Sequence, residues 1–77
     1  MKIFSERIRE LREERKWKQK DVAEALGISV TCYAGYEQGY RLPNIDMLAQ
    51  IAIYFGISTD YLLGLEDESG NRPHIKP

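Results

Sequence analysis

A chain of 77 residues forms one small domain, and a domain of this size buries only about 60% of its unfolded surface, which leaves no room for a deep substrate cleft. Hydrophobic residues make up 43% of the chain and charged residues 30%, and no apolar run approaches the roughly 20 residues that span a bilayer, so we expect a cytoplasmic protein without membrane contact. The sequence offers one cysteine, no nucleophile paired with a base and no ligand cluster, so we expect no enzyme, cofactor, metal or small-molecule ligand.

The net charge of -1 is unevenly distributed along the chain. Residues 1 to 20 carry eight Lys or Arg and four Glu, whereas residues 21 to 65 carry one Arg and five acidic residues. A positive start that faces phosphate is one interpretation of this asymmetry. An ordinary solvated helix, which shows charges at the same spacing, is the other, and the sequence leaves both open.

The first predicted helix spans about residues 5 to 15. Phe4, Ile8 and Leu11 recur there at helical spacing, and Ser5 is expected to be the N-cap. Trp17 follows the helix and is expected to close over its end.

Two further helices are predicted at residues 19 to 26 and 29 to 38, joined by a short turn. Gly27 favours that turn because glycine adopts positive φ readily, and Ser29 is expected to accept from the first free amides of the second helix. Two helices joined in this way form a helix-turn-helix, here over residues 19 to 38.

A fourth and a fifth helix complete the predicted domain. Asn44 is expected to cap the fourth helix, which ends at Gly56 and carries an apolar stripe of Ile45, Leu48, Ile51, Ala52 and Phe55. Ser58 starts a short fifth helix that ends at Gly64. The sequence therefore predicts an all-α, five-helix domain over residues 1 to 65, followed by a flexible acidic tail at residues 66 to 77.

Several motifs within residues 5 to 64 are specific. They are the helix that begins at Gln19, the Tyr-Glu-x-Gly end of the third helix, Pro43, and the closing Ser-Thr-Asp-Tyr-Leu-Leu-Gly. In these motifs the chain closely resembles the DNA-binding domain of the phage Cro and repressor family, often called XRE-like regulators. The resemblance implies a lambda-repressor-like fold, a third helix in the major groove of double-stranded operator DNA, a symmetric homodimer on a palindromic site, and transcriptional regulation as a repressor.

The resemblance also implies individual DNA contacts. Gln19, at the amide end of its helix, matches a phosphate contact, and Tyr40 and Arg41 match positions that grip the sugar-phosphate backbone. The positions that match base-reading residues are Val30, Thr31, Ala34 and Gly35, with Ser29 as a further hydrogen-bonding candidate. Because most of these offer no polar group, direct readout is expected to be weak, and specificity is expected to depend on DNA shape, on bridging water or on the turn after the third helix.

Lys18 stands where the family usually has a Ser or Thr cap, and an ammonium group cannot accept a hydrogen bond from the free amides. Two outcomes are open. A phosphate oxygen binds these amides in the complex with DNA, or water or Asp21 satisfies that end of the helix in the free protein.

Two structural contacts complete the implied set. Arg12 and Glu37 occupy the positions of a partly buried salt bridge between the first helix and the end of the third. Ile53 stands where the family usually has a polar residue, and it predicts a two-fold contact together with Thr59, Tyr61 and Leu65. The alternative is that Ile53 is singly exposed or packs under the tail.

A second function stays open. The low charge of residues 29 to 38 also fits a protein-interaction module, such as an antitoxin or anti-regulator, that keeps the helix-turn-helix shape and binds protein through Val30 and Ala34.

Overall fold

The structure is a computed structural model in which residues 1–67 are described, and these residues form five helices and no strand. The helices are α1 (Lys2–Glu14), α2 (Gln19–Leu26), α3 (Val30–Gln38), α4 (Ile45–Phe55) and α5 (Thr59–Leu62). The predicted all-α fold is confirmed. Most of the predicted acidic tail, residues 68–77, lies outside the described residues. No helix within residues 1–67 is long and apolar enough to cross a membrane.

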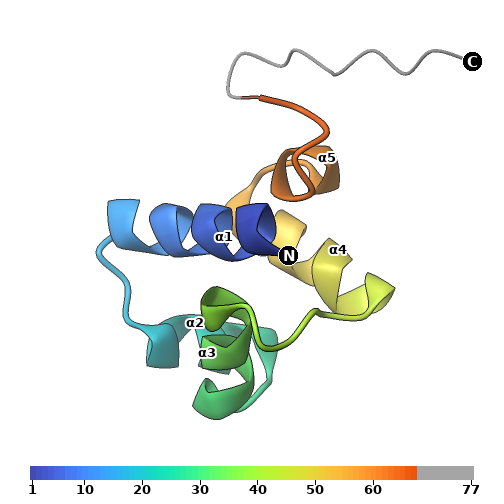
Figure 1. Ribbon diagram of the computed structural model, residues 1–77. Helices are drawn as coiled ribbons and strands as arrows, with labels where there is room; N and C mark the ends of the chain where they lie inside the picture. The colour runs from blue at the N-terminus through green and yellow to red at the C-terminus, as the bar shows by residue number, and fades with distance from the viewer. Residues whose placement is uncertain (68–77) are drawn as a thin grey trace, which may run out of the picture.

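The helices pack around α1. It crosses the middle of the molecule, with the α2–α3 pair below it and α5 above it (Figure 1). α1 contacts α3 and α5, while α4 contacts α2 and α5. The helix-turn-helix is therefore held from two sides, by α1 through α3 and by α4 through α2.

All five helices contribute to one core. Twelve apolar side chains are at most 8% exposed: Phe4, Ile8, Leu11, Val22, Ala23, Leu26, Tyr33, Tyr36, Ile51, Ala52, Phe55 and Leu62. The apolar face predicted for the first helix is buried as expected. Trp17 lies with its ring centroid 5.1 Å from that of Tyr54 and 6.2 Å from that of Phe55, so it closes the space between the end of α1 and α4.

α1 begins three residues before the expected start, and the prediction that Ser5 is its N-cap is wrong. Ser5 is buried within the helix, and its hydroxyl donates to the carbonyl of Lys2 at 2.9 Å. A serine inside a helix commonly makes such a bond to the preceding turn. Phe4 packs edge-on against Tyr36, with ring centroids 6.4 Å apart, and this contact favours the extra turn.

The apolar stripe predicted for the fourth helix is buried at its C-terminal end only. Ile51, Ala52 and Phe55 belong to the core and Leu48 packs against it, but Ile45 is 84% exposed. The expectation for Ile45 is therefore wrong. Its turn lies at the edge of the molecule, where α4 begins (Figure 1), so no neighbouring helix covers it.

The chain leaves α1 through a Schellman turn. The N–H of Lys16 donates to the carbonyl of Glu13, and the N–H of Trp17 donates to that of Arg12. Lys16 occupies the left-handed position of this turn, with φ of 57°, where glycine is the usual residue. The turn sets the direction in which the chain enters α2.

Candidate nucleic-acid interface

The outer face of α3 is free of the core and forms a shallow hollow with the loop that follows the helix. The hollow has a volume of about 510 Å³ and is lined by Val30, Thr31, Ala34, Gly35, Gln38, Tyr40 and Arg41. The structure thus brings together the four predicted base-reading positions and both predicted loop positions. Gln38 was missed, although its spacing of four residues from Ala34 places it on the same helical face.

The inner face of α3 is buried. Tyr33 is fully buried and Tyr36 is 7% exposed, as predicted for the inward side of this helix. Ser29 caps the helix, because its hydroxyl accepts from the N–H of Cys32 at 3.0 Å. The Ser29 hydroxyl, a candidate for hydrogen bonds to DNA, thus already accepts a bond within the protein. It lies at the start of α3, next to the exposed Val30 and Thr31.

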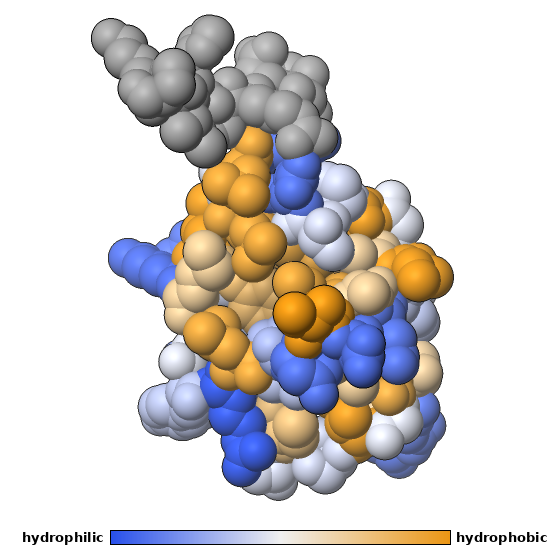
Figure 2. Space-filling model, turned by 90° about the vertical axis from the view of Figure 1, so that its right-hand side faces the viewer, coloured by the Kyte–Doolittle hydropathy of each residue, from blue (hydrophilic) through white to orange (hydrophobic). Residues whose placement is uncertain are grey.

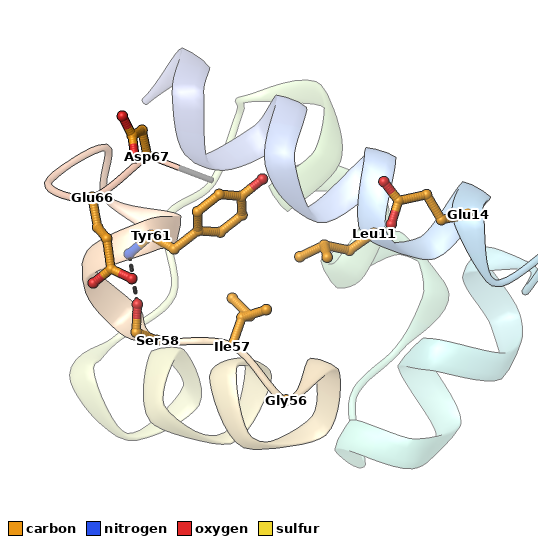
Figure 3. A pocket seen from close by; sticks show the side chains of 8 residues that line it. All are labelled: Leu11, Glu14, Gly56, Ile57, Ser58, Tyr61, Glu66 and Asp67. Atoms are coloured by element: carbon orange, nitrogen blue, oxygen red, sulfur yellow. Dashed lines mark hydrogen bonds between the residues drawn. The ribbon is translucent and has the colours of Figure 1, made fainter. Parts of the chain in front are cut away.

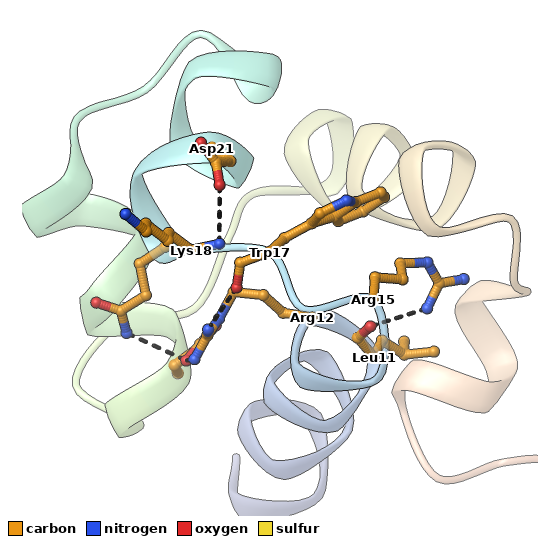
Figure 4. Close-up of polar contacts among 8 residues, drawn as sticks. Leu11, Arg12, Arg15, Trp17, Lys18 and Asp21 are labelled. Atoms are coloured by element: carbon orange, nitrogen blue, oxygen red, sulfur yellow. Dashed lines mark hydrogen bonds and ion pairs between the residues drawn. The ribbon is translucent and has the colours of Figure 1, made fainter.

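The amide end of α2 lies close to α3. The N–H of Lys18 donates to Asp21 Oδ2 at 2.9 Å (Figure 4), so Asp21 satisfies the backbone N–H of Lys18, the residue at the N-cap position. The N–H groups of Asp21 and Val22 donate to the carbonyl of Lys18. The N–H groups of Gln19 and Lys20 are the remaining amides of the first turn, and Lys18 makes no side-chain cap for them.

The Arg12–Glu37 salt bridge is present and ties three segments together. Arg12 Nε donates to Glu37 Oε2 at 2.6 Å and Arg12 Nη2 donates to Oε1 at 2.9 Å, which is a two-pronged contact. Arg12 Nη1 also donates to the carbonyl of Trp17 at 2.9 Å (Figure 4). Gln19 Nε2 donates to Glu37 Oε1 at 3.1 Å, so the side chain that was expected on phosphate turns towards the ion pair.

This network keeps Glu37 ionised although its side chain is only 2% exposed. Burial raises the pKa of Glu37, but the hydrogen bonds from Arg12, the nearby Tyr33 hydroxyl, the hydrogen bond from Gln19 and the charge of Arg12 outweigh burial and lower the pKa below its ordinary value. Burial and the adjacent Glu37 carboxylate raise the pKa of the Tyr33 hydroxyl, which makes no hydrogen bond of normal distance and angle. The end of α3 is thus fixed by one satisfied charge pair beside one unsatisfied hydroxyl.

Comparison with known proteins gives the family of this fold and hollow. A helix-turn-helix family model matches residues 8–62, which is most of the chain. The chain belongs to the XRE-type helix-turn-helix family. This family and the relatives below are regulators and not enzymes.

The relatives of this XRE-type domain are longer than the chain. It is 41% identical over 68 residues to the HTH-type transcriptional regulator AnsR of Bacillus subtilis (strain 168), covering 88% of this chain and 59% of AnsR. It is 34% identical over 55 residues to the cryptic phage CTXphi transcriptional repressor RstR of Vibrio cholerae, covering 71% of this chain and 50% of RstR. A transcriptional regulator from Listeria innocua, solved by crystallography, matches with a TM-score of 0.76 and 34% identity over 84% of this chain and 61% of that chain.

Three of the eight Lys and Arg residues within residues 1 to 20 of this XRE-type domain make internal contacts. Arg7 lies 4.1 Å from the centre of the Tyr61 ring and donates to the carbonyls of Tyr61 and Glu66. Arg15 donates to the carbonyls of Leu11 and Phe55, each at 2.9 Å. Together with Arg12, these residues use their charge in contacts within the domain, which neither interpretation of the charge asymmetry included. The cations left exposed in this region are Lys2, Arg9, Lys16, Lys18 and Lys20.

A second hollow of about 520 Å³ lies between α1 and the α4–α5 turn. Figure 3 shows its lining: Leu11, Glu14, Gly56, Ile57, Ser58, Tyr61, Glu66 and Asp67. Three carboxylates repel phosphate, so this hollow does not suit nucleic acid. Within residues 1–67, no three His, Cys, Asp or Glu residues are grouped to hold a metal ion.

The predicted dimer residues differ in exposure. Ile53 is 80% exposed and Leu65 is 42% exposed, whereas Thr59 is half-buried and Tyr61 is half-buried beneath Arg7. Apolar side chains also gather on the side of the molecule where α4 begins (Figure 2). A small groove of about 110 Å³ is lined by Met1, Phe4, Leu42, Pro43, Leu48 and Leu63. The XRE-type domain therefore has exposed apolar surface outside the hollow of α3.

Proposed function

We propose that this XRE-type domain binds double-stranded DNA sequence-specifically and regulates transcription in the cytoplasm, as a repressor. α3 enters the major groove and presents the residues of its hollow to base edges. The observation that carries the proposal is the division of α3 into a buried face, with Tyr33 and Tyr36, and an outer face free of the core. The names of AnsR and RstR as transcriptional regulators add support.

The start of α2 binds phosphate in this proposal. The backbone N–H groups of Gln19 and Lys20 point along the helix axis at its positive end, which favours an anion there. The exposed ammonium groups of Lys18 and Lys20 add charge beside these amides. Tyr40, which is 82% exposed, supplies a hydroxyl in the loop after α3. Two lysines per copy neutralise about four phosphates in a dimer, so we expect a shallow logarithmic salt slope of about -4.

A homodimer on a palindromic operator is part of the proposal, and Ile53 is its central contact. Burying an isoleucine that is 80% exposed contributes favourable free energy only when a partner covers it. Ile53→Glu is expected to shift the protein towards the monomer in sedimentation. Ile45→Glu is the matched control, because Ile45 is equally exposed at the other end of α4. Dissociation by the control and not by Ile53→Glu would place the contact elsewhere.

Selection from pooled random duplexes at low and moderate salt tests the function. Enrichment of a palindromic site supports the regulator, and Thr31→Ala is then expected to change the preference at one base pair of each half-site. Absence of enrichment rejects DNA readout. That result favours the interaction module, because Val30 is 43% exposed and, with Ala34, gives the hollow an apolar side that a protein partner can cover.

A further inference from the structure

Gly35 and Arg41 occupy one site on the outer face of α3. A Cβ added to Gly35 would lie 2.9 Å from Arg41 Cδ, 3.1 Å from Cγ and 3.4 Å from Nε. The distances to Cδ and Cγ are shorter than ordinary van der Waals contacts, so the stem of Arg41 fills the space that a side chain at position 35 would need. Gly35 is buried for this reason, although it lies on the side of α3 that faces away from the core.

The path of the loop produces this arrangement. Gly39 ends α3 in the left-handed region, with φ of 86°, and turns the chain back over the helix. The N–H groups of Tyr40 and Arg41 both donate to the carbonyl of Gly35, at 2.9 Å and 3.2 Å. These two bonds fix the backbone of Arg41 directly beside Gly35, and the side chain then lies along α3.

Arg41 supplies the chemistry that the rest of the hollow lacks. Among the seven residues that line the hollow, Arg41 alone carries a charge. The charge of Arg41 also acts on Tyr36: burial, together with the Cys32 thiol, raises the pKa of Tyr36 to about 12, while the positive charge of Arg41 opposes that rise. Arg41 Nε lies 3.4 Å from the position that a Cβ of Gly35 would take, so the start of the guanidinium group lies against α3.

We propose that Arg41, which lies in the loop and not in α3, is a further specificity-determining residue of the hollow beside the side chains of α3, and that it reads a guanine in the major groove. A guanidinium fork donates two hydrogen bonds to guanine O6 and N7, and the space left by Gly35 lets the fork come from the loop onto the reading face of the helix. This inference rests on the proposed function, and it assigns Arg41 to a base where the family resemblance implies the sugar-phosphate backbone.

The two roles of Arg41 predict different results for a charge-conserving change. Arg41→Lys keeps the positive charge but loses the planar fork. A base-reading Arg41 then loses its preference for guanine at one position of each half-site, by roughly 5- to 150-fold, while the salt slope stays the same. A phosphate-bound Arg41 would keep its sequence preference in Arg41→Lys. Arg9→Lys, an exposed arginine of α1 outside the hollow, is the matched control.

Gly35→Ala provides an independent test, since it leaves Arg41 in the chain and removes the space for its stem. The contact at 2.9 Å is with a flexible side chain, so the domain is expected to stay folded and Arg41 to be displaced. Alanine also favours a helix more than glycine does, so the melting temperature is expected to hold or rise. We expect Gly35→Ala to lose the same guanine preference as Arg41→Lys, and the double variant to lose little more than either one.

The experiment is selection from pooled random duplexes with the wild-type protein, Arg41→Lys, Gly35→Ala and Arg9→Lys, at low and moderate salt. Loss of one base-pair preference in both hollow variants, with the control unchanged, supports the inference. Equal selection by wild type and Arg41→Lys overturns it and leaves the proposed function intact. Absence of any enriched site with the wild-type protein overturns the proposed function and the inference together.

Discussion

The Arg12–Glu37 pair predicts a large loss of stability when one charge is removed and the other stays. Arg12→Met keeps most of the apolar stem but removes both bonds to Glu37 and the bond to the Trp17 carbonyl. Glu37, with a side chain 2% exposed, would keep only the Gln19 bond of 3.1 Å. Stranding a buried charge costs about 3–5 kcal/mol. A domain of this size has a free energy of unfolding of about 4–12 kcal/mol, so the variant is expected to be marginally stable.

Removal of both charges is expected to be far less harmful. The double variant Arg12→Met/Glu37→Met leaves no buried ion, and replacing a buried ion pair by apolar groups is often neutral or stabilising. We therefore expect its free energy of unfolding to lie within about 2 kcal/mol of that of the wild type. Glu37→Met alone is expected to cost less than Arg12→Met, because Arg12 is 15% exposed and keeps the Trp17 carbonyl. Urea unfolding of the four proteins at neutral pH, followed by circular dichroism, measures the coupling between the two residues.

The reasoning fails if the double variant loses as much free energy as the two single variants added together. Such additivity would mean that the two residues act independently. The loss in Arg12→Met would then come from the Trp17 carbonyl and from packing, and the ion pair would not hold α3 against α1.

Further outcomes follow from the same contacts. The free energy of unfolding is expected to fall as the pH drops below about 4.5, since the pKa of Glu37 is lowered in the folded state and the unfolded chain takes up the proton first; Glu37→Gln should remove this contribution in urea unfolding at acid pH. Ser29→Ala loses the cap of α3 and is expected to cost about 1 kcal/mol in thermal unfolding, whereas Thr31→Ala, exposed on the same helix, should stay within about 0.5 kcal/mol. Lys16→Gly removes the backbone strain of a non-glycine residue in the left-handed region. It is expected to raise the free energy of unfolding by about 1 kcal/mol, measured by urea unfolding. Tyr33→Phe removes a buried hydroxyl that makes no hydrogen bond of normal geometry but lies beside the Glu37 carboxylate, so the two effects oppose each other and the free energy of unfolding is expected to change by less than about 1 kcal/mol in urea unfolding.

The helix-turn-helix could be predicted closely because its signals are local. Gly27 and Gly39 adopt positive φ and Ser29 caps α3, and each of these signals works within a few residues of the chain. Ser5 misled the prediction because a serine hydroxyl binds backbone both at an N-cap and inside a helix. The choice between these two depends on Phe4 reaching the core, which is a tertiary contact.

The polar contacts of the site could be predicted only in part. The Arg12–Glu37 pair followed from the family resemblance, but the turn of Gln19 towards it and the use of Arg7 and Arg15 on carbonyls depend on how distant helices meet. The position of Arg41 against Gly35 was equally out of reach. It depends on the return path of a loop, which no spacing along the chain reports.

The contacts of Arg12 fix the spacing of the two elements that meet DNA in the proposed complex. One guanidinium group joins the end of α1, the approach to α2 and the end of α3, so the first turn of α2 and the outer face of α3 form a single rigid gauge. Because the distance between these two protein elements is fixed, the DNA has to deform to match it. Base steps that the protein never touches would then affect the affinity, according to how easily each step bends or twists to match the gauge.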